Sequence, residues 1–219
     1  MKVSLNWVTP NAEEAIVEIA RVSSSRKNKK DKPEKLINYL LKHKHFSPFE
    51  HGYMSLEIET SKAIGIQLIR HRSFTFQEFS QRYQDVNKIG DMFESIELRK
   101  QAEDNRQSST EVLDGATAWM VGGDLLDLML QIQNTYNQLL DAGVARECAR
   151  MILPMCTKTK IHMTGSIRSW LGFLNVRLDG HAQKEIVDIA NAVADHMEEQ
   201  FPNITSALDN FNDRKGMFM

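Results

Sequence analysis

The chain has 219 residues, of which 42% are hydrophobic and 26% are charged, and its formal net charge at pH 7 is −2. This composition is typical of a globular protein with a substantial core, and the near-neutral charge argues against wholesale binding of nucleic acid. No apolar run reaches the roughly 18 residues that a membrane helix needs, and the N-terminus lacks the apolar core of a signal peptide. With only two cysteines, reduced thiols rather than a disulfide framework are expected, in a cytoplasmic protein.

The first predicted elements are a strand and a helix. Apolar and polar residues alternate over Lys2–Val8, which predicts a short strand. Asn11 can cap a helix that runs to about Val22. The inner stripe of this helix is expected to be Ala15, Ile16, Ile19 and Ala20.

A run of cations precedes the second predicted helix. It comprises Arg26, Lys27, Lys29, Lys30, Lys32 and Lys35. These side chains could form a basic recognition patch, but Asp31, Pro33 and Glu34 together are typical of a helix start. A solvated loop that leads into a helix is therefore the favoured interpretation. That helix should run to about His43 and bury Leu36, Tyr39 and Leu40.

Strands and a capped helix are predicted in the middle of the chain. Alternation over His51–Thr60 predicts a strand with one polar face, and Ser61 can cap the apolar helix that follows. A second alternating segment, Met92–Leu98, predicts another strand. The polar segment Gln101–Thr110 is expected to be a loop.

The C-terminal half reads as predominantly helical. A long helical region is expected before Gly143, which stops it, with Gly122-Gly123 as a candidate interruption. Shorter elements follow: a helix over Val144–Leu153, a strand over Lys158–Met163 and a helix over Ser166–Asn175. The last helix should start near Asp179-Gly180 and carry inward Ile186, Ile189, Ala190, Val193 and Met197.

Together these elements predict an α+β fold. Helices dominate, strands are few, and neither a regular strand–helix alternation nor an internal repeat occurs. We expect one compact domain over residues 1–219, helix-rich, with a small mixed or antiparallel sheet and no Rossmann unit. Neither GxGxxG nor GxxxxGK[ST] is present, so any phosphates would be held by arginines, serines and helix ends.

The densest chemistry lies in residues 70–83, Arg-His-Arg-Ser-Phe-Thr-Phe-Gln-Glu-Phe-Ser-Gln-Arg-Tyr. The apolar segment Ile64–Ile69 leads directly into this motif. Burying a chain next to two guanidinium groups and an imidazole is costly unless anions meet those charges. The motif therefore predicts a site for the phosphates of a ligand.

Seven arginines lie close to apolar segments: Arg70, Arg72, Arg82, Arg146, Arg150, Arg168 and Arg177. The forked guanidinium group suits bidentate contacts with phosphate, carboxylate or imide oxygens. Taken singly, each arginine could simply pair with an acid such as Glu50, Glu78, Glu147 or Asp179. Taken together, they favour anion binding.

Histidines and cysteines support weaker hypotheses. His43, His45 and His51 could hold a metal, but no second ligand cluster with zinc-like spacing accompanies them. Cys148 and Cys156 lie in apolar surroundings in the sequence, so we expect them to be small buried residues rather than nucleophiles.

Ser80 is a further candidate nucleophile, because Glu78, Arg82 and His71 lie near it in the sequence. A catalytic serine needs an aligned base, however, and a sequence does not supply that geometry.

The signature Arg70-His71-Arg72, then seven residues and Ser80, continued by Gln81-Arg82-Tyr83, resembles that of the flavin-dependent thymidylate synthases. The likeness extends to Ser47-Pro48-Phe49-Glu50-His51, to Arg146-Glu147-Cys148-Ala149-Arg150 with Leu153-Pro154, and to Arg168-Ser169 and the block 173–186. It covers most of Ser47 to Pro202. Gln77, Ser166 and Gly172 stand where asparagine is familiar in the family.

The resemblance implies a homotetramer with shared active sites that binds FAD without a Rossmann fold. The reaction implied is a methyl transfer that converts dUMP to dTMP without an enzyme nucleophile. The compound 5,10-methylenetetrahydrofolate would supply the carbon, and FAD reduced by NADPH would supply hydride. Neither a nucleic acid nor a membrane is an expected partner.

The resemblance also implies roles for individual residues. The implied cofactor ligands are Ser47, Glu50, Arg70, His71, Arg72, Glu78, Ser166, Arg168, Gly172 and His181. The implied substrate ligands are Gln67, Arg70, Glu78, Phe79, Ser80, Gln81, Arg82, Arg150 and Arg177. Arg177 is implied to be catalytic, because a guanidinium group against the uracil imide would favour its ionised form.

Two other classes of function stay open on the residues alone. A nucleotide- or RNA-binding module would use the same arginines, with Phe74, Phe76, Phe79 and Tyr83 as stacking faces. A structural or assembly protein would use the arginines as ion pairs between subunits. Bound flavin would distinguish a synthase from both classes. Turnover would distinguish an active synthase from a former one that still binds FAD but no longer forms dTMP.

Overall fold

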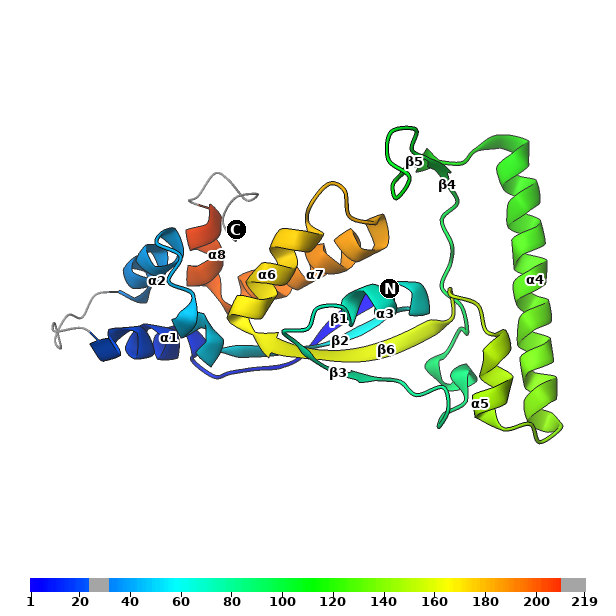
Figure 1. Cartoon of the computed structure of the whole chain (residues 1–219), viewed down its shortest axis with the longest axis horizontal. Helices are drawn as coiled ribbons and strands as arrows, with labels where there is room; N and C mark the ends of the chain where they lie inside the picture. Colours follow the sequence, from blue (N-terminus) through cyan, green and yellow to red (C-terminus); the bar gives the residue numbers. More distant parts are fainter. Residues whose placement is uncertain (24–31, 210–219) are drawn as a thin grey trace. The chain divides into compact units, whose positions relative to one another are not determined.

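The computed structural model describes residues 1–23 and 32–209, which form two compact units (Figure 1). Unit 1 comprises residue 1 and residues 59–68 and 77–161. Unit 2 comprises residues 2–58, 69–76 and the chain from residue 162 onward. The cations predicted as a loop at positions 26, 27, 29 and 30, and the predicted capping acid Asp31, lie outside the described residues.

A four-stranded antiparallel sheet has the order β1-β2-β6-β3. Its strands are β1 (Lys2–Val8), β2 (Tyr53–Ser61), β6 (Lys158–Ser166) and β3 (Thr75–Glu78). In β2 and β6, residues with buried side chains alternate with partly exposed ones, because one face of the sheet carries the core. The predicted α+β class and the strands predicted over Lys2–Val8, His51–Thr60 and Lys158–Met163 are confirmed.

Unit 2 contains most of the helices. They are α1 (Ala12–Ala20), α2 (Pro33–Lys42), α6 (Ile167–Arg177), α7 (Lys184–Gln200) and α8 (Pro202–Asp209), with 3-10 turns at η1 (Arg21–Ser23) and η2 (Ser47–His51). Helix α7 packs against α6, α8 and β1 (Figure 1). The inward stripe predicted for the last helix is confirmed, since all five of its residues are buried. The helix starts at Lys184, later than predicted, and α8 was not predicted.

Unit 1 is built around α4 (Gly115–Asp141), which packs against α5 (Arg146–Ala149) and the turn η4 (Arg150–Ile152). It also contains α3 (Lys62–Leu68), the turn η3 (Val86–Ile89) and the hairpin of β4 (Arg99–Gln101) and β5 (Ser109–Val112). Tyr136 of α4 is fully buried in a small core with Val86, Met92 and Ala149. Helix α4 ends before Gly143, as predicted; Gly143 has a φ of 81°.

The strand predicted over Met92–Leu98 is wrong. Among the residues that the structure describes, this segment contributes an isolated bridge between Phe93 and Thr157. The β4–β5 hairpin instead includes part of Gln101–Thr110, which was predicted to be a loop. Polar cross-strand pairs stabilise the hairpin, with Lys100 Nζ 3.0 Å from Glu111 Oε1. Because these pairs are polar, apolar alternation did not indicate the strands.

Three other local predictions differ from the structure. Gly122-Gly123 do not interrupt α4, although each glycine costs a helix about 1 kcal/mol. Asn11 stands at the N-cap of α1 with a φ of 51° and makes no side-chain capping bond. Tyr39, expected to be buried, is 51% exposed, whereas the predicted burial of Leu40 is confirmed and α2 also buries Ile37 and Leu41.

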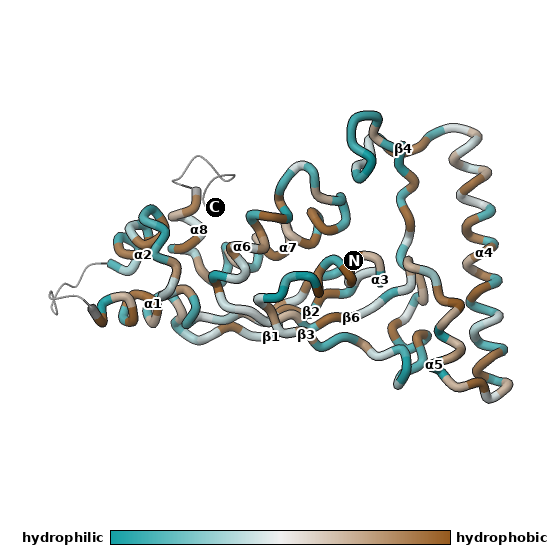
Figure 2. The backbone as a smooth tube through the Cα atoms, in the orientation of Figure 1, coloured by the Kyte–Doolittle hydropathy of each residue, from teal (hydrophilic) through white to brown (hydrophobic). Residues whose placement is uncertain are grey.

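Helix α4 carries an exposed apolar surface, visible as hydrophobic segments that recur along its length (Figure 2). Its exposed large apolar side chains are Trp119, Met120, Val121, Leu126, Leu128 and Leu130. Trp119 is 85% exposed. No helix within residues 1–23 and 32–209 is both long enough and apolar enough to cross a membrane.

Candidate functional site

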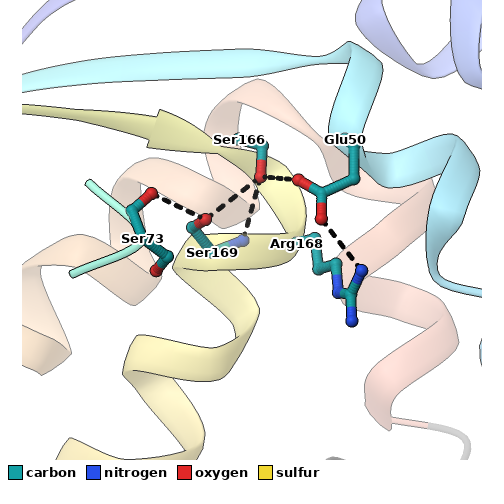
Figure 3. A network of polar contacts seen from close by, with 5 residues as sticks. All are labelled: Glu50, Ser73, Ser166, Arg168 and Ser169. Atoms are coloured by element: carbon teal, nitrogen blue, oxygen red, sulfur yellow. Dashed lines mark hydrogen bonds and ion pairs between the residues drawn. The ribbon is translucent and has the colours of Figure 1, made fainter. Parts of the chain in front are cut away.

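A chain of hydrogen bonds in unit 2 ties the start of α6 to η2 (Figure 3). Ser166, the last residue of β6, caps α6 by accepting a hydrogen bond from the Ser169 backbone N–H at 3.2 Å. Its hydroxyl also donates to Glu50 Oε2 at 2.6 Å, and Glu50 Oε1 accepts from Arg168 at 2.9 Å. Ser169 in turn donates to the Ser73 carbonyl at 3.2 Å. Three predicted cofactor ligands, Glu50, Ser166 and Arg168, are thus brought together.

This network borders an open cavity of about 500 Å³ in unit 2. The cavity is lined by Glu50, His71, Ser73, Arg168, Ser169, Gly172 and Phe173. A Cβ atom added at Gly172 would meet no atom of the described residues within 4 Å, so a side chain at this position would project into open space. A second cavity of about 450 Å³ in the same unit includes Ser47 and Arg168 in its lining.

His71 accepts a hydrogen bond at Nε2 from Arg177 Nε at 2.8 Å and packs edge-on against Phe173. Burial, and secondly the positive charge of Arg177, lower the pKa of His71 from 6.5 to about 4. The imidazole is therefore neutral at physiological pH, which leaves its lone pair free to accept this bond. Burial and the nearby charge of Arg70 lower the pKa of Arg177.

The other predicted residues of unit 2 are exposed to solvent. Arg70 and Arg72 lie between α3 and β3 with exposed side chains. His181 lies in the turn before α7, where its backbone N–H donates to Asp179 Oδ1 at 2.9 Å.

Glu78 is the centre of a second network, which lies in unit 1. Its Oε1 atom accepts from Lys62 Nζ and from Thr159 Oγ1, each at 2.7 Å. Glu78 therefore pairs with a lysine rather than with an arginine. Gln67 lies on α3, and the Phe79 backbone N–H donates to the Lys160 carbonyl at 2.8 Å.

Two predicted substrate ligands in unit 1 carry buried donors without partners. Gln81 is only 7% exposed, and its Nε2 atom has no hydrogen-bond partner among the described residues. The same is true of Arg150 Nε in the turn after α5. A buried polar group without a partner costs about 1–3 kcal/mol. These two donors therefore point to a ligand that supplies acceptors.

Ser80 and Arg82 are the neighbours of Gln81 in the chain, and both are exposed. The Ser80 carbonyl accepts from the backbone N–H groups of Tyr83 and Gln84 at 3.0 and 2.9 Å. Arg82 forms an exposed ion pair with Glu147 of α5, at 3.3 Å. This pair and that of Arg168 with Glu50 match the simple ion-pairing alternative, but both guanidinium groups remain more than half exposed.

Several weaker hypotheses are changed by the structure. Phe74 is buried against Trp170 and Phe173, so its assignment as a stacking face for nucleic acid is wrong. Cys148 is exposed rather than buried, and Cys156 is partly buried with a raised pKa caused by that burial. Within the described ranges, no three histidine, cysteine or acidic side chains cluster as metal ligands would. His43 and His45 instead stack near Tyr39.

Sequence reasoning missed Lys62, Thr159, Ser73 and Ser169 as members of these networks. The spacing of Ser166 and Ser169 is typical of a helix N-terminus and could have indicated the second serine. Nothing in the sequence links Lys62 or Thr159 to Glu78, because Thr159 lies 81 residues away along the chain.

Comparisons with known proteins agree with the signature. The family described as "Thymidylate synthase complementing protein" matches residues 4–203. A probable flavin-dependent thymidylate synthase from Paramecium bursaria Chlorella virus 1 is 41% identical over 201 residues, which cover 90% of this chain and 91% of that protein. The flavin-dependent thymidylate synthase of Synechocystis sp. is 38% identical over 190 residues, 87% of this chain and 86% of that protein. That of Thermosipho melanesiensis is 33% identical over 199 residues, 90% and 86% respectively. The chain belongs to the family of flavin-dependent thymidylate synthases.

Proposed function

We propose that this protein converts dUMP to dTMP, with 5,10-methylenetetrahydrofolate as the carbon donor and NADPH as the reductant. Bound FAD would supply the hydride chemistry. The observation that carries this proposal is the presence, on a member of this family, of buried donors at Gln81 and Arg150 whose partners are missing among the described residues. We take residues 1–219 to be one domain of this family, acting in the cytoplasm.

The cavity of unit 2 fits a flavin nucleotide. It combines the Arg168 guanidinium group, the hydroxyl groups of Ser73 and Ser169 and the aromatic edge of Phe173, which suit phosphates and a planar ring. Glu50 and Ser166 orient Arg168 and the start of α6. We propose as FAD ligands Ser47, Glu50, Arg70, His71, Arg72, Glu78, Ser166, Arg168, Gly172 and His181.

The nucleotide is proposed to be held by Gln67, Arg70, Glu78, Phe79, Ser80, Gln81, Arg82, Arg150 and Arg177. Phosphate and uracil oxygens are acceptors, which is what the unpaired nitrogens of Gln81 and Arg150 require. The exposed guanidinium group of Arg82 can exchange Glu147 for a phosphate at small cost, because an exposed ion pair is worth about 0–1 kcal/mol. Ser80 acts in this proposal as a ligand.

Arg177 is proposed to be the catalytic residue. Its guanidinium group, partly buried and held by the neutral His71, would stabilise negative charge on the uracil imide and so favour the ionised ring. A positive group in a partly dry site stabilises developing charge more strongly than one in water.

No thiol is needed as a nucleophile in this proposal. Cys156 has a raised pKa and is therefore poorly suited to form a thiolate, and Cys148 is exposed on α5. A Cys148→Ser, Cys156→Ser double variant should accordingly keep its dTMP-forming activity.

We propose that the protein assembles as a homotetramer with shared active sites. Its exposed apolar surface on α4 supports self-association, because such surfaces on soluble proteins commonly mark interfaces. Changing Leu126 and Leu130 to lysine should reduce the mass measured by light scattering. A Val22→Lys change, at an apolar residue 86% exposed outside α4, is the matched control.

The first experiment is the visible spectrum of the purified protein, followed by addition of dUMP, 5,10-methylenetetrahydrofolate and NADPH. A flavin spectrum together with dTMP formation is the expected result. Bound flavin without any dTMP would overturn the proposed activity. If added FAD does not bind at all, the flavin site is wrong as well.

A further inference from the structure

The Glu78 carboxylate is held by one oxygen atom. Lys62 Nζ and Thr159 Oγ1 both reach Oε1 at 2.7 Å. Among the described residues, no hydrogen bond or ion pair reaches Oε2. The two partners come from α3 and β6, so two separate elements fix one side chain of β3.

Backbone contacts hold both partners in place. The N–H groups of Lys62 and Ala63 donate to the carbonyls of Thr157 and Met155 at 2.9 and 3.0 Å, which anchors the start of α3. Gly65 then allows α3 to pack closely: a Cβ atom there would lie 3.1 Å from Ile161 Cδ1 and 3.3 Å from Thr159 Cγ2. The buried Thr159 side chain is therefore restrained by packing, and Lys62 by its place on the helix.

We infer that Lys62 and Thr159 are positioning residues, which hold Glu78 by Oε1 so that Oε2 accepts a hydrogen bond from the bound nucleotide. A carboxylate has acceptor sites on both oxygens. When one oxygen is occupied by an ammonium and a hydroxyl group, the rotation of the carboxylate is restricted and the other oxygen keeps one orientation. The hydrogen-bonding partner of Oε2 would be an N–H or O–H group of the nucleotide. The inference rests on the proposed role of Glu78 as a nucleotide ligand.

The test uses the full-length, flavin-loaded protein and dUMP itself as the probe. Thr159→Val removes the hydroxyl group at nearly constant shape, whereas Thr159→Ser keeps it. We expect the Kd of dUMP, measured by calorimetry, to rise about tenfold in Thr159→Val and by less than about twofold in Thr159→Ser. KM for dUMP should rise in the same way with kcat little changed.

Lys62→Met provides a second variant in case Thr159→Val does not fold. Its matched control is Lys160→Met, which removes a lysine paired with Glu59 at 3.0 Å and similarly exposed, at 35% against 28% for Lys62. Lys62→Met should weaken dUMP binding about tenfold, and Lys160→Met should leave it within about twofold of the wild type.

A double-mutant cycle separates positioning from a structural role. In a Glu78→Ala background, Thr159→Val should cause no further loss of dUMP affinity, because there is no carboxylate left to hold. Equal losses in both backgrounds, or equal losses in Thr159→Val and Thr159→Ser, would overturn the inference while leaving the synthase activity intact. A wild-type protein that loads flavin but does not bind dUMP would overturn the proposed function and the inference with it.

Discussion

The polar groups of the Glu50 network in unit 2 differ in their hydrogen bonding from two side chains of unit 1, Gln81 and Arg150. In unit 2, the carboxylate, two serine hydroxyls and a guanidinium group satisfy one another within the protein. In unit 1, Gln81 Nε2 and Arg150 Nε are buried without a partner among the described residues. The first arrangement fixes geometry before a ligand arrives, and the second leaves hydrogen-bonding capacity for the ligand to fill.

The difference has an energetic consequence. A satisfied network contributes to the stability of the free protein, and this contribution is small at the Glu50–Arg168 pair, where both side chains are largely exposed. A buried donor that is unsatisfied lowers the stability and can be compensated on binding. Substitutions in the two regions should therefore separate stability from ligand affinity.

The largest effect is expected at Arg177, whose Nε donates a hydrogen bond to His71. Arg177→Ala should lower kcat for dTMP formation about 10²–10³-fold, because it removes a donor aimed at developing charge. Flavin absorbance per subunit should remain, and rapid-mixing measurement of dTMP would supply the rate. Arg177→Lys is the matched control, since it keeps the charge and loses the fork. A rate near that of the wild type in Arg177→Ala would show that the catalytic assignment is mistaken.

At Gln81, stability and binding should move in opposite directions. Gln81→Met replaces an amide whose nitrogen is unsatisfied, so the free energy of unfolding should stay constant or rise by about 1 kcal/mol, while the Kd of dUMP rises about tenfold. Urea unfolding and calorimetry give the two values.

Gln84→Met is the control for Gln81, since the amide of Gln84 accepts from Lys88 Nζ at 3.1 Å and is therefore paired. That variant should gain no stability and should bind dUMP normally. If Gln81→Met were destabilised to the same degree as other buried polar changes, the unpaired state of its amide in the free protein would be refuted.

Acid should weaken the fold through His71. Its pKa is about 4 in the folded protein and 6.5 when unperturbed, so between these values the unfolded chain binds a proton that the folded chain does not. Stability therefore falls as pH drops from 6.5 towards 4, by about 2 kcal/mol once partial solvent exposure is discounted. Urea unfolding at several pH values in this window measures the slope. His71→Gln should show a smaller slope than the wild type, and an unchanged slope would assign the effect to other groups.

The smallest effect is expected at Ser166, where a satisfied cap is removed. Ser166→Ala should lower the free energy of unfolding by about 1 kcal/mol, because the Ser169 N–H loses its acceptor. Ser166→Thr keeps the hydroxyl group and should lose less. Thermal unfolding of flavin-free protein would compare the two, and a fully stable Ser166→Ala would mean that the network contributes nothing to the free protein.

Local patterns predicted a good part of this structure. The capping role of Ser61, whose hydroxyl accepts from Ile64 N–H at 3.4 Å, follows from its place before an apolar helix. The buried stripe of α7 follows from helical periodicity. The hairpin β4–β5 and the strand β3 inside the arginine-rich motif could not be predicted in this way, because short strands with polar faces depend on their pairing partners.

The sequence alone determined the family, through an ordered set of charged and polar residues around Arg70-His71-Arg72. It also determined the buried stripe of α7 and the capping role of Ser61. Those features are local, since they depend on spacing along the chain and on hydrogen bonds within a turn or two. Only the tertiary structure decided which polar groups meet: Ser166 with Glu50 across 116 residues, and Glu78 with Thr159 across 81. Such pairings depend on strand order and close helix packing, which bring together residues whose separation along the chain carries no signal.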